Sequence, residues 1–294
     1  MRLVLSEIPV PKRHQYLLSA VSPRPIAFAS TVDKDGNPNL APFSFFNLMG
    51  SNPPIAVFSP ALSGRDKSSK HTLDNILQTK EVVINIVHWS MVRQMSLTSA
   101  PFAKGVNEFV KSGLTPIPSE LIKPFRVKES YVQMECKVLD VIKTGTEGAA
   151  GNIVISEIML MHIDDSVLDA EGKIDPYKMD YVARMGGHYY TRVTSESIFD
   201  LPQPKDDHHI GVDALPAAIR MSTILTGNEL GQLGTLPALP DEITIRNFME
   251  QHKEFIAKLN TDPVAIHTAA QVLLNEDRTE DAACLLLANE YMLL

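Results

Sequence analysis

The sequence predicts a mainly β domain followed by an α-helical extension. Within residues 1–205, short segments rich in Val, Ile and Phe are separated by Gly, Pro, Asn and Asp, which is typical of an antiparallel barrel or sandwich. Across residues 206–294 the apolar residues recur at helical spacing instead. The charge changes at the same place: residues 1–205 hold 21 acidic and 22 basic residues, whereas residues 206–294 hold 14 and 5. We therefore place a domain boundary between residues 205 and 206.

The elements of the first domain follow from local composition. Five segments have the β-branched and aromatic character of strands: residues 25–32, 54–59, 81–87, 131–139 and 152–163. Residues 33–38 contain Asp-Gly and Asn-Pro and predict a turn after the first of these strands. The patterns also predict peripheral helices over residues 70–79 and 89–98.

The extension reads as a set of short helices. Six apolar residues fall on one helical face: Ile245, Phe248, Met249, Phe255, Ile256 and Leu259. The sequence Thr261-Asp262-Pro263 is a helix start, and residues 277–280 restart a helix that we expect to end near Leu293. These last two helices resemble an αα-hairpin without a fixed repeat period. We expect an appendage that packs on the barrel or across a dimer and holds no second catalytic site.

Composition excludes several classes of function. Cys136 and Cys284 are the only cysteines and lie far apart, so a disulfide scaffold or a thiolate metal site is not expected. No apolar run reaches the length of a membrane span, and the first residues turn polar too early for a signal peptide. The chain lacks the basic face that nucleic-acid binding requires. We expect a cytoplasmic protein with no resident metal, no nucleic-acid partner and no membrane association.

A cluster of cations and hydroxyls lies in residues 63–72. This segment carries three Lys or Arg residues, four hydroxyl side chains and a glycine, all of which suit a dianionic phosphate. The candidates for phosphate contact are Arg65, Ser69, Lys70, His71 and Thr72. A helix beginning near His71 would direct its positive end and free N–H groups at the same anion. A solvated surface loop explains the composition equally well.

An aromatic turn precedes this cluster. Ser44, Phe45, Phe46 and Asn47 join apolar rings to an amide, a combination that suits a flat polar-edged ring. The alternative is a barrel strand with its aromatic side chains inside, although a buried Asn47 would then need hydrogen-bond partners. A phosphate site beside a flat-ring site indicates a nucleotide cofactor.

Several stretches in a fixed order resemble the flavin reductase-like family, whose fold is the FMN-binding split β-barrel. The first is Ser-Pro-Arg-Pro-Ile-Ala-Phe-Ala-Ser-Thr-Val-Asp at residues 22–33, followed by Leu-Ala-Pro-Phe-Ser-Phe-Phe-Asn at 40–47. Asn-Pro-Pro-Ile-Ala-Val-Phe-Ser-Pro at 52–60, Lys-His-Thr-Leu-Asp-Asn-Ile at 70–76 and Arg-Met-Gly-Gly-His-Tyr-Tyr at 184–190 complete the pattern. The resemblance covers roughly residues 1–200 and leaves residues 206–294 unexplained.

The resemblance implies a set of FMN contacts. It places the strand end at Ser30 beside the ribityl or phosphate part, and it places the paired glycines at 186–187 beside the ring, where they permit close backbone approach. Relatives often carry an acidic residue where this chain has His71. No catalytic residue is assigned, and His188 is a candidate proton donor. The full set of expected cofactor contacts is Ser30, Thr31, Val32, Ser44, Phe45, Phe46, Asn47, Ser59, Arg65, Ser69, Lys70, His71, Thr72, Gly187, His188 and Tyr189.

The activity implied is reduction of flavin by NADH or NADPH, with hydride transfer to N5, in a homodimer. Two alternatives stay open: a tightly FMN-bound electron carrier of the flavoredoxin type, and a non-enzymatic flavin- or haem-binding module whose acidic tail recruits a partner. Glycines 145, 148 and 151 lack the spacing of a dinucleotide-binding turn and lie between two predicted strands, so we expect a hairpin loop there. The sequence therefore leaves the choice between NADH and NADPH open, together with the final electron acceptor and whether FMN is retained or released.

Overall fold

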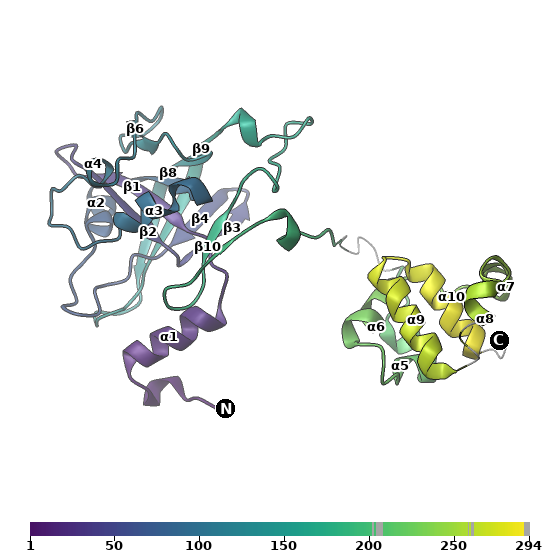
Figure 1. Cartoon of the computed structure of the whole chain (residues 1–294). Coiled ribbons are helices and arrows are strands. Elements are labelled where there is room, and N and C mark those ends of the chain that lie inside the picture. The colour runs from purple at the N-terminus through teal and green to yellow at the C-terminus, as the bar shows by residue number, and fades with distance from the viewer. Residues whose placement is uncertain (202, 204–207, 258, 260–261, 291–294) are drawn as a thin grey trace. The chain divides into compact units, whose positions relative to one another are not determined.

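The chain forms two compact units, Met1–Phe199 and Asp200–Leu294 (Figure 1). The computed structural model describes all residues except 202, 204–207, 258, 260–261 and 291–294. The division lies shortly before the boundary placed at residues 205 and 206 from composition and charge.

A seven-stranded antiparallel sheet forms the centre of the first unit. Its strand order is β2-β1-β5-β8-β9-β4-β3, and every neighbouring pair is antiparallel. The strands are β1 (Ala27–Val32), β2 (Pro38–Phe43), β3 (Phe46–Ser51), β4 (Pro54–Phe58), β5 (Glu81–Ile86), β8 (Val132–Lys143) and β9 (Asn152–Ile163). All five strands predicted from composition are present, and the mainly β split-barrel fold class is confirmed.

Short helices and two small ladders surround this sheet (Figure 1). The helices are α1 (Val10–Ala20), α2 (His71–Thr79), α3 (Val92–Leu97) and α4 (Glu108–Ser112). The ladders pair β6 (Pro116–Ile117) with β7 (Arg126–Val127) and β10 (Val182–Arg184) with β11 (Tyr190–Arg192). Single 3₁₀ turns lie at Leu5–Glu7, Trp89–Met91, Asp165–Val167 and Ser195–Ser197. The predicted helices over residues 70–79 and 89–98 correspond to α2 and to the 3₁₀ turn followed by α3.

Strand β1 is buried along its whole length because both of its faces are covered. Successive side chains of a strand point to opposite faces. Ala27 and Ala29 accordingly join one apolar cluster with Leu73 and Ile76 of α2, whereas Phe28 joins another that includes residues of α3 and α4. The two layers fix the end of β1 and the start of α2 against each other.

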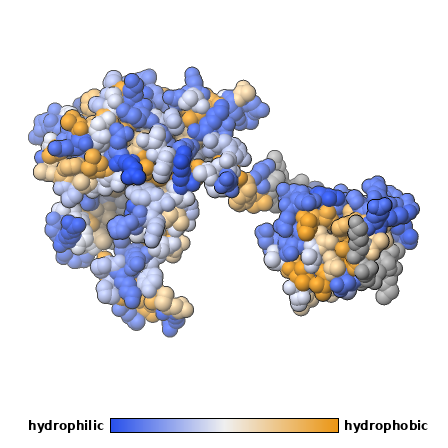
Figure 2. Space-filling view, in the orientation of Figure 1, coloured by the Kyte–Doolittle hydropathy of each residue, from blue (hydrophilic) through white to orange (hydrophobic). Residues whose placement is uncertain are grey.

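The second unit is helical and has an apolar core of its own. Its elements are a 3₁₀ turn at Val212–Ala214, α5 (Ala217–Arg220), α6 (Gly227–Leu233), α7 (Glu242–Gln251), α8 (Lys253–Ala257), α9 (Pro263–Asn275) and α10 (Thr279–Glu290). Residues 282–288 of α10 are all buried, so α10 is the central helix of this unit. Figure 2 shows apolar surface on this unit where Figure 1 labels α9, bordered by hydrophilic surface. The apolar faces pack mainly on one another, and docking on the barrel stays a prediction.

Two expectations for the extension are refined by this unit. Asp262 caps α9, accepting a hydrogen bond from the Val264 N–H at 3.1 Å, and α9 with α10 forms the predicted αα-hairpin. Five of the six residues expected on one apolar face over residues 245–259 pack in or against the core of the unit, but the face spans two helices, because α7 ends at Gln251 and α8 begins at Lys253. The expected helix end at Leu293 and the helix-start residue Thr261 lie outside the described residues.

Three further expectations concern membranes, metals and thiols. None of the helices in the described ranges is long and apolar enough to cross a membrane. Among the same residues, no group of three or more His, Cys, Asp or Glu side chains is placed to hold a metal ion. Cys136 and Cys284 are free and buried, and burial raises the pKa of both thiols to about 12, so neither is a reactive thiolate at neutral pH.

Candidate functional site

A cavity of about 290 Å³ lies where the 63–72 loop meets β2, the start of α2 and residues 98–102. Five of the residues predicted for phosphate contact line it: Arg65, Ser69, Lys70, His71 and Thr72. Phe43 of β2 and Phe102 add apolar surface to the same wall, and Glu108 of α4 adds a carboxylate. The structure therefore gathers the predicted cation cluster around one hollow.

The 63–72 loop is held in shape by its own polar groups. The Ser63 N–H donates to the Ser68 carbonyl at 2.9 Å, and the Asp66 carboxylate accepts from the Ser68 hydroxyl at 2.7 Å. Hydrogen bonds from the hydroxyls of Ser63 and Ser68 hold the pKa of Asp66 well below its usual range. Lys67 points to Glu147, with Nζ and Oε2 2.6 Å apart. One of the three loop cations is therefore already neutralised.

The other two cations, Arg65 and Lys70, line the cavity. Within the described part of the chain, neither side chain makes an ion pair or a hydrogen bond. Thus the loop presents two unpaired cations at the hollow, together with the Asp66 carboxylate that its own hydroxyl groups bind. Such groups bind phosphate oxygens through charge-assisted hydrogen bonds.

The β8–β9 hairpin supports the loop from the opposite side. The Leu62 N–H donates to the Ala150 carbonyl at 2.9 Å, and the Ala149 N–H donates to the Leu62 carbonyl at 3.1 Å. A Cβ on Gly148 would lie 3.2 Å from the Ser63 carbonyl oxygen and 3.3 Å from the Gly64 Cα. The Gly145-x-x-Gly148-x-x-Gly151 segment is therefore a hairpin loop, as predicted, and its middle glycine permits close contact with the phosphate-type loop.

Helix α2 starts at the cavity and is tied there by two polar pairs. The Asn39 amide donates to the Thr72 hydroxyl at 2.8 Å, and the Asn75 amide donates to the Thr31 hydroxyl at 3.0 Å. These bonds join β1 and β2 to the first turns of α2. The first backbone N–H groups of a helix have no partner within the helix, and they carry partial positive charge. His71 and Thr72, in this first turn, line the cavity, so the helix start adds to its positive field.

The remaining predicted contacts of the strand ends lie deeper in the sheet. Val32 is buried, and the Thr31 hydroxyl is occupied by Asn75. The Ser59 hydroxyl accepts from the Asn152 N–H at 3.0 Å. The buried Ser30 hydroxyl has no hydrogen-bond partner among the described residues. Ser30 does not line the cavity, so its predicted contact with the cofactor stays a prediction.

The aromatic turn lies at the surface. Phe45 is 43% exposed, while Ser44 and Phe46 are half-buried. Asn47 is exposed, and its side-chain oxygen accepts from the Leu48 N–H at 2.8 Å. In the single chain the aromatic turn is therefore not the fully buried strand of the alternative interpretation, and Asn47 stays accessible.

Gly187, His188 and Tyr189 form the exposed turn between β10 and β11. Gly187 adopts a φ of +59°, and its carbonyl accepts from the Arg184 guanidinium at 2.9 Å. The same guanidinium lies over the Tyr190 ring, 4.5 Å from its centroid. The turn is thus held by its own strand, and its three predicted contact residues stay accessible.

Helix α1, which the sequence analysis missed, connects the aromatic turn with this second turn. The His14 ring lies edge-on to Phe45 with centroids 6.3 Å apart. At the other end of the helix, a Cβ on Gly186 would collide with Ser19, so only glycine fits there. Prolines at positions 9 and 11 mark the start of this helix and are the local signal that could have revealed it.

Arg24 holds α1 in place through hydrogen bonds to backbone carbonyls. Its guanidinium donates to the carbonyls of Leu18, of Val21 at 2.7 Å and of Met185 at 3.0 Å. Arg24 is buried, and burial lowers the pKa of its guanidinium. The Arg of the Ser-Pro-Arg-Pro motif therefore serves to join α1 to the end of β10.

Glu108 is the other cavity residue that the sequence analysis missed. It is buried, and its carboxylate accepts from the Leu40 N–H at 3.1 Å. Burial raises the pKa of Glu108 above its ordinary value, whereas the Leu40 hydrogen bond and the nearby His71 act in the opposite direction. A titratable carboxyl therefore shares the cavity with two free cations.

The first unit has the split-barrel fold of flavin reductase-like proteins. The chain belongs to the flavin reductase-like family: the family's flavin reductase like domain matches residues 19–182. A protein of Aquifex aeolicus is 36% identical over 197 residues, which span 67% of this chain and 97% of that protein. The family match includes the 63–72 loop and ends before the second unit.

Two solved structures are similar to the first unit. One is nitrilotriacetate monooxygenase component B from Bacillus cereus, with a TM-score of 0.64 and 28% identity, covering 68% of this chain and 98% of that one. The other is 2-nitrobenzoate 2-nitroreductase from Pseudomonas fluorescens, with a TM-score of 0.61 and 26% identity, covering 70% of this chain and 97% of that one.

Proposed function

We propose that this protein is an NAD(P)H-dependent flavin oxidoreductase that binds FMN in the first unit. The observation that carries the proposal is the cavity at the start of α2, where Arg65 and Lys70 make no ion pair within the described residues. Family membership and the similarity to a monooxygenase component and to a nitroreductase support a redox role.

The residues present fit FMN. Arg65, Lys70 and Ser69 would donate to the phosphate together with the first N–H groups of α2. The turns at 44–47 and 187–189 would contact the ring, with Asn47 at its polar edge and His188 as a candidate proton donor. FMN, when bound, supplies the group that accepts a hydride from a reduced nicotinamide. The protein's part is to orient the two rings and to keep one face of the site open.

The proposal includes a homodimer in the cytoplasm. Edge strand β3 exposes Leu48 and Met49, which follow the exposed Phe45. An unpaired edge strand that displays apolar side chains favours association with a second chain. Sedimentation of Leu48→Glu should give a lighter species than the wild type. An unchanged sedimentation coefficient would remove β3 from the interface.

Two measurements test the function. The visible spectrum of the purified chain, with and without added FMN, shows whether the flavin binds. The oxidation of NADH and of NADPH is then followed with excess free FMN. Sustained turnover supports the reductase, and a single reduction of bound FMN without turnover identifies an electron carrier. FMN binding without reduction by either nucleotide would reject the oxidoreductase proposal.

A further inference from the structure

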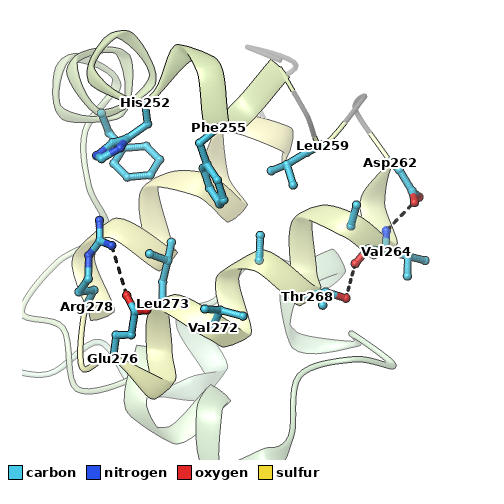
Figure 3. Close-up of a pocket in the computed structure, with 13 residues that line it drawn as sticks. His252, Phe255, Leu259, Asp262, Val264, Thr268, Val272, Leu273, Glu276 and Arg278 are labelled. Atoms are coloured by element: carbon cyan, nitrogen blue, oxygen red, sulfur yellow. Dashed lines mark hydrogen bonds and ion pairs between the residues drawn. The ribbon is translucent and has the colours of Figure 1, made fainter.

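The helical unit carries an apolar groove whose floor is formed by residues at the edge of its core. The groove has a volume of about 790 Å³ and runs between α7 and α8 on one side and α9 on the other. Figure 3 shows side chains from these facing helices directed into the same space. Its apolar lining includes Phe248, Phe255, Val264, Ala269, Val272 and Leu273.

Several of these side chains remain open to solvent. Phe255 is 39% exposed and Val272 is 53% exposed, and neither belongs to the apolar core cluster. Thr268 donates its hydroxyl to the Val264 carbonyl at 2.8 Å, so its polar group is satisfied within α9. A concentrated apolar surface of this kind marks a binding site more often than a solvated face.

The charged residues of the groove lining are Asp262, Glu276 and Arg278. Arg278 lies at one end, and it is paired with Glu276 at 3.3 Å and with Asp281 at 2.8 Å. Lys253, beside the groove, lies 3.9 Å from Glu250. Both cations are therefore compensated, while residues 206–294 carry 14 acidic and 5 basic residues. The helical unit as a whole is therefore strongly acidic, and the groove lining itself holds two acidic residues and one basic residue.

The charge selects among possible occupants. A second copy would bring two strongly acidic units together, and an anionic lipid surface would meet the same repulsion. A basic partner gains from this acidic charge while its apolar residues fill the groove. The 13 residues of α9 span about 20 Å, which matches a partner helix of three to four turns.

We propose that the groove binds an amphipathic helix of another protein, with apolar residues at i, i+3, i+4 and i+7 and Lys or Arg along its borders. This is the helix-in-groove mode of peptide recognition. The interaction uses only the helical unit, so it stands or falls independently of flavin chemistry in the first unit. Its consequence is that a flavoprotein barrel is attached to a recruiting module.

The test uses the full chain and a fluorescent 18-residue peptide of Leu and Lys, with Leu at the four spacings given above. A peptide of the same composition with Leu distributed around the helix controls for charge alone. Fluorescence anisotropy is measured at about 0.15 M salt, where long-range charge effects are screened. The ordered peptide should bind at least about tenfold more tightly than the scrambled one. Equal affinities would overturn the proposal.

Matched variants locate the binding. Val272→Glu places a charge in the groove, whereas Ile243→Glu places the same charge on α7 at a residue that is 70% exposed and outside the groove lining. Both variants make the unit more acidic, so attraction by charge alone would strengthen binding in both. We expect Val272→Glu to weaken binding about tenfold or more and Ile243→Glu to leave it within about twofold. Equal effects of the two variants would reject the groove as the binding site.

Other occupants give distinct results in the same experiment. Circular dichroism first verifies that both variants keep the helical content of the wild type. If Val272→Glu loses helical content, Val264→Glu replaces it as the groove variant. Self-association that Val272→Glu abolishes, without peptide binding, would replace the partner helix with a second copy. Binding of anionic vesicles that Val272→Glu abolishes would replace it with a lipid surface. Either result contradicts the proposal.

Discussion

The two units differ most in what they bury. Among the described residues, 18 polar or charged side chains are buried, and 16 of them lie in residues 1–199. The two in the helical unit hold helices and turns together: Glu229 completes the capping box of α6 with Thr226, and the His267 ring contacts the Ser222 hydroxyl at 2.7 Å. Buried polar groups require partners and fix geometry. The interior of the barrel therefore contains many polar groups that fix the positions of neighbouring segments, whereas the interior of the helical unit is mainly apolar and serves packing.

The cavities differ in the same way. The barrel cavity joins free cations and a helix start to a few apolar side chains, which favours a phosphate-bearing ligand. The groove of the helical unit is apolar and lies in a strongly acidic unit, which favours a basic amphipathic partner. If both proposals hold, the single chain divides cofactor binding from partner binding. Substitutions confined to one unit should then leave the function of the other intact.

The largest effect should come from the core of the helical unit. Leu285 is fully buried on α10, so Leu285→Ala should lower the free energy of unfolding of this unit by about 2–5 kcal/mol. FMN affinity should stay within about twofold, because no cavity residue belongs to that core. Thermal denaturation followed by circular dichroism, together with FMN titration, measures both quantities.

Ile84→Ala is the matched control in the barrel, since Ile84 is equally buried. It should lower the stability of the first unit and leave the helical transition in place. A joint loss of FMN binding and helical stability in the Leu285 variant would show that the units form one cooperative structure.

A smaller effect is expected at the phosphate-type loop. Replacing Arg65 and Lys70 together with Ala should weaken FMN binding by about 2–4 kcal/mol, since a hydrogen bond to a charged group contributes about 1.5–3 kcal/mol. Riboflavin, which lacks the phosphate, should bind nearly as it does to the wild type. Lys67→Ala is the control, because Lys67 is paired with Glu147. Equal losses for FMN and riboflavin would remove the phosphate assignment.

The barrel could be predicted largely from sequence because its signals are local. Runs of β-branched residues indicate the strands. Five polar candidates within eight residues, Arg65 to Thr72, indicate the phosphate-type loop. The polar pairs that shape the cavity were missed because they are distant in sequence: Asn75 and Thr31 are 44 residues apart, and Glu108 and Leu40 are 68 apart. Helix α1 was missed because it buries no residue and so lacks a strong apolar stripe.

In the helical unit the local pattern predicted the helices but not which of their side chains form the core. Its apolar spacing predicted the αα-hairpin of α9 and α10, but the same spacing could not separate core from groove. Ile256 packs against the core, while its neighbour Phe255 lines the groove. Successive residues of a helix point about 100° apart, so these two neighbours face different directions. The apolar spacing alone does not decide which of the two directions faces the core.

The smallest predicted effect concerns Glu108 and depends on pH. A carboxyl whose pKa is higher in the folded protein favours the folded state while it is protonated. That contribution is complete below the unfolded-chain value of about 4.3 and is lost as the pH rises through the folded value. The ionised carboxylate also repels a phosphate in the same cavity. Both effects therefore appear on the alkaline side of the folded pKa.

Glu108→Gln should remove this dependence. The Gln side-chain oxygen can still accept from the Leu40 N–H, so the fold is retained while the charge is lost. We expect the variant to bind FMN roughly three- to tenfold more tightly than the wild type at pH 8, as one partly screened charge repulsion of about 1 kcal/mol is removed. The advantage should shrink as the pH falls through the folded pKa of Glu108. Comparing variant and wild type at each pH cancels the titration of the phosphate itself.

Two controls separate this effect from general changes in charge. Glu129→Gln removes an acid that also accepts a backbone N–H, from Thr115 at 3.0 Å, but lies outside the cavity lining, and it should leave FMN affinity unchanged. Riboflavin affinity should not respond to Glu108→Gln at any pH, because the repulsion acts on the phosphate. If riboflavin gains as much as FMN, Glu108 acts on the shape of the cavity. If neither ligand binds more tightly to Glu108→Gln at pH 8, the phosphate does not lie beside Glu108. The phosphate site would then be assigned to the cation-bearing loop without α4.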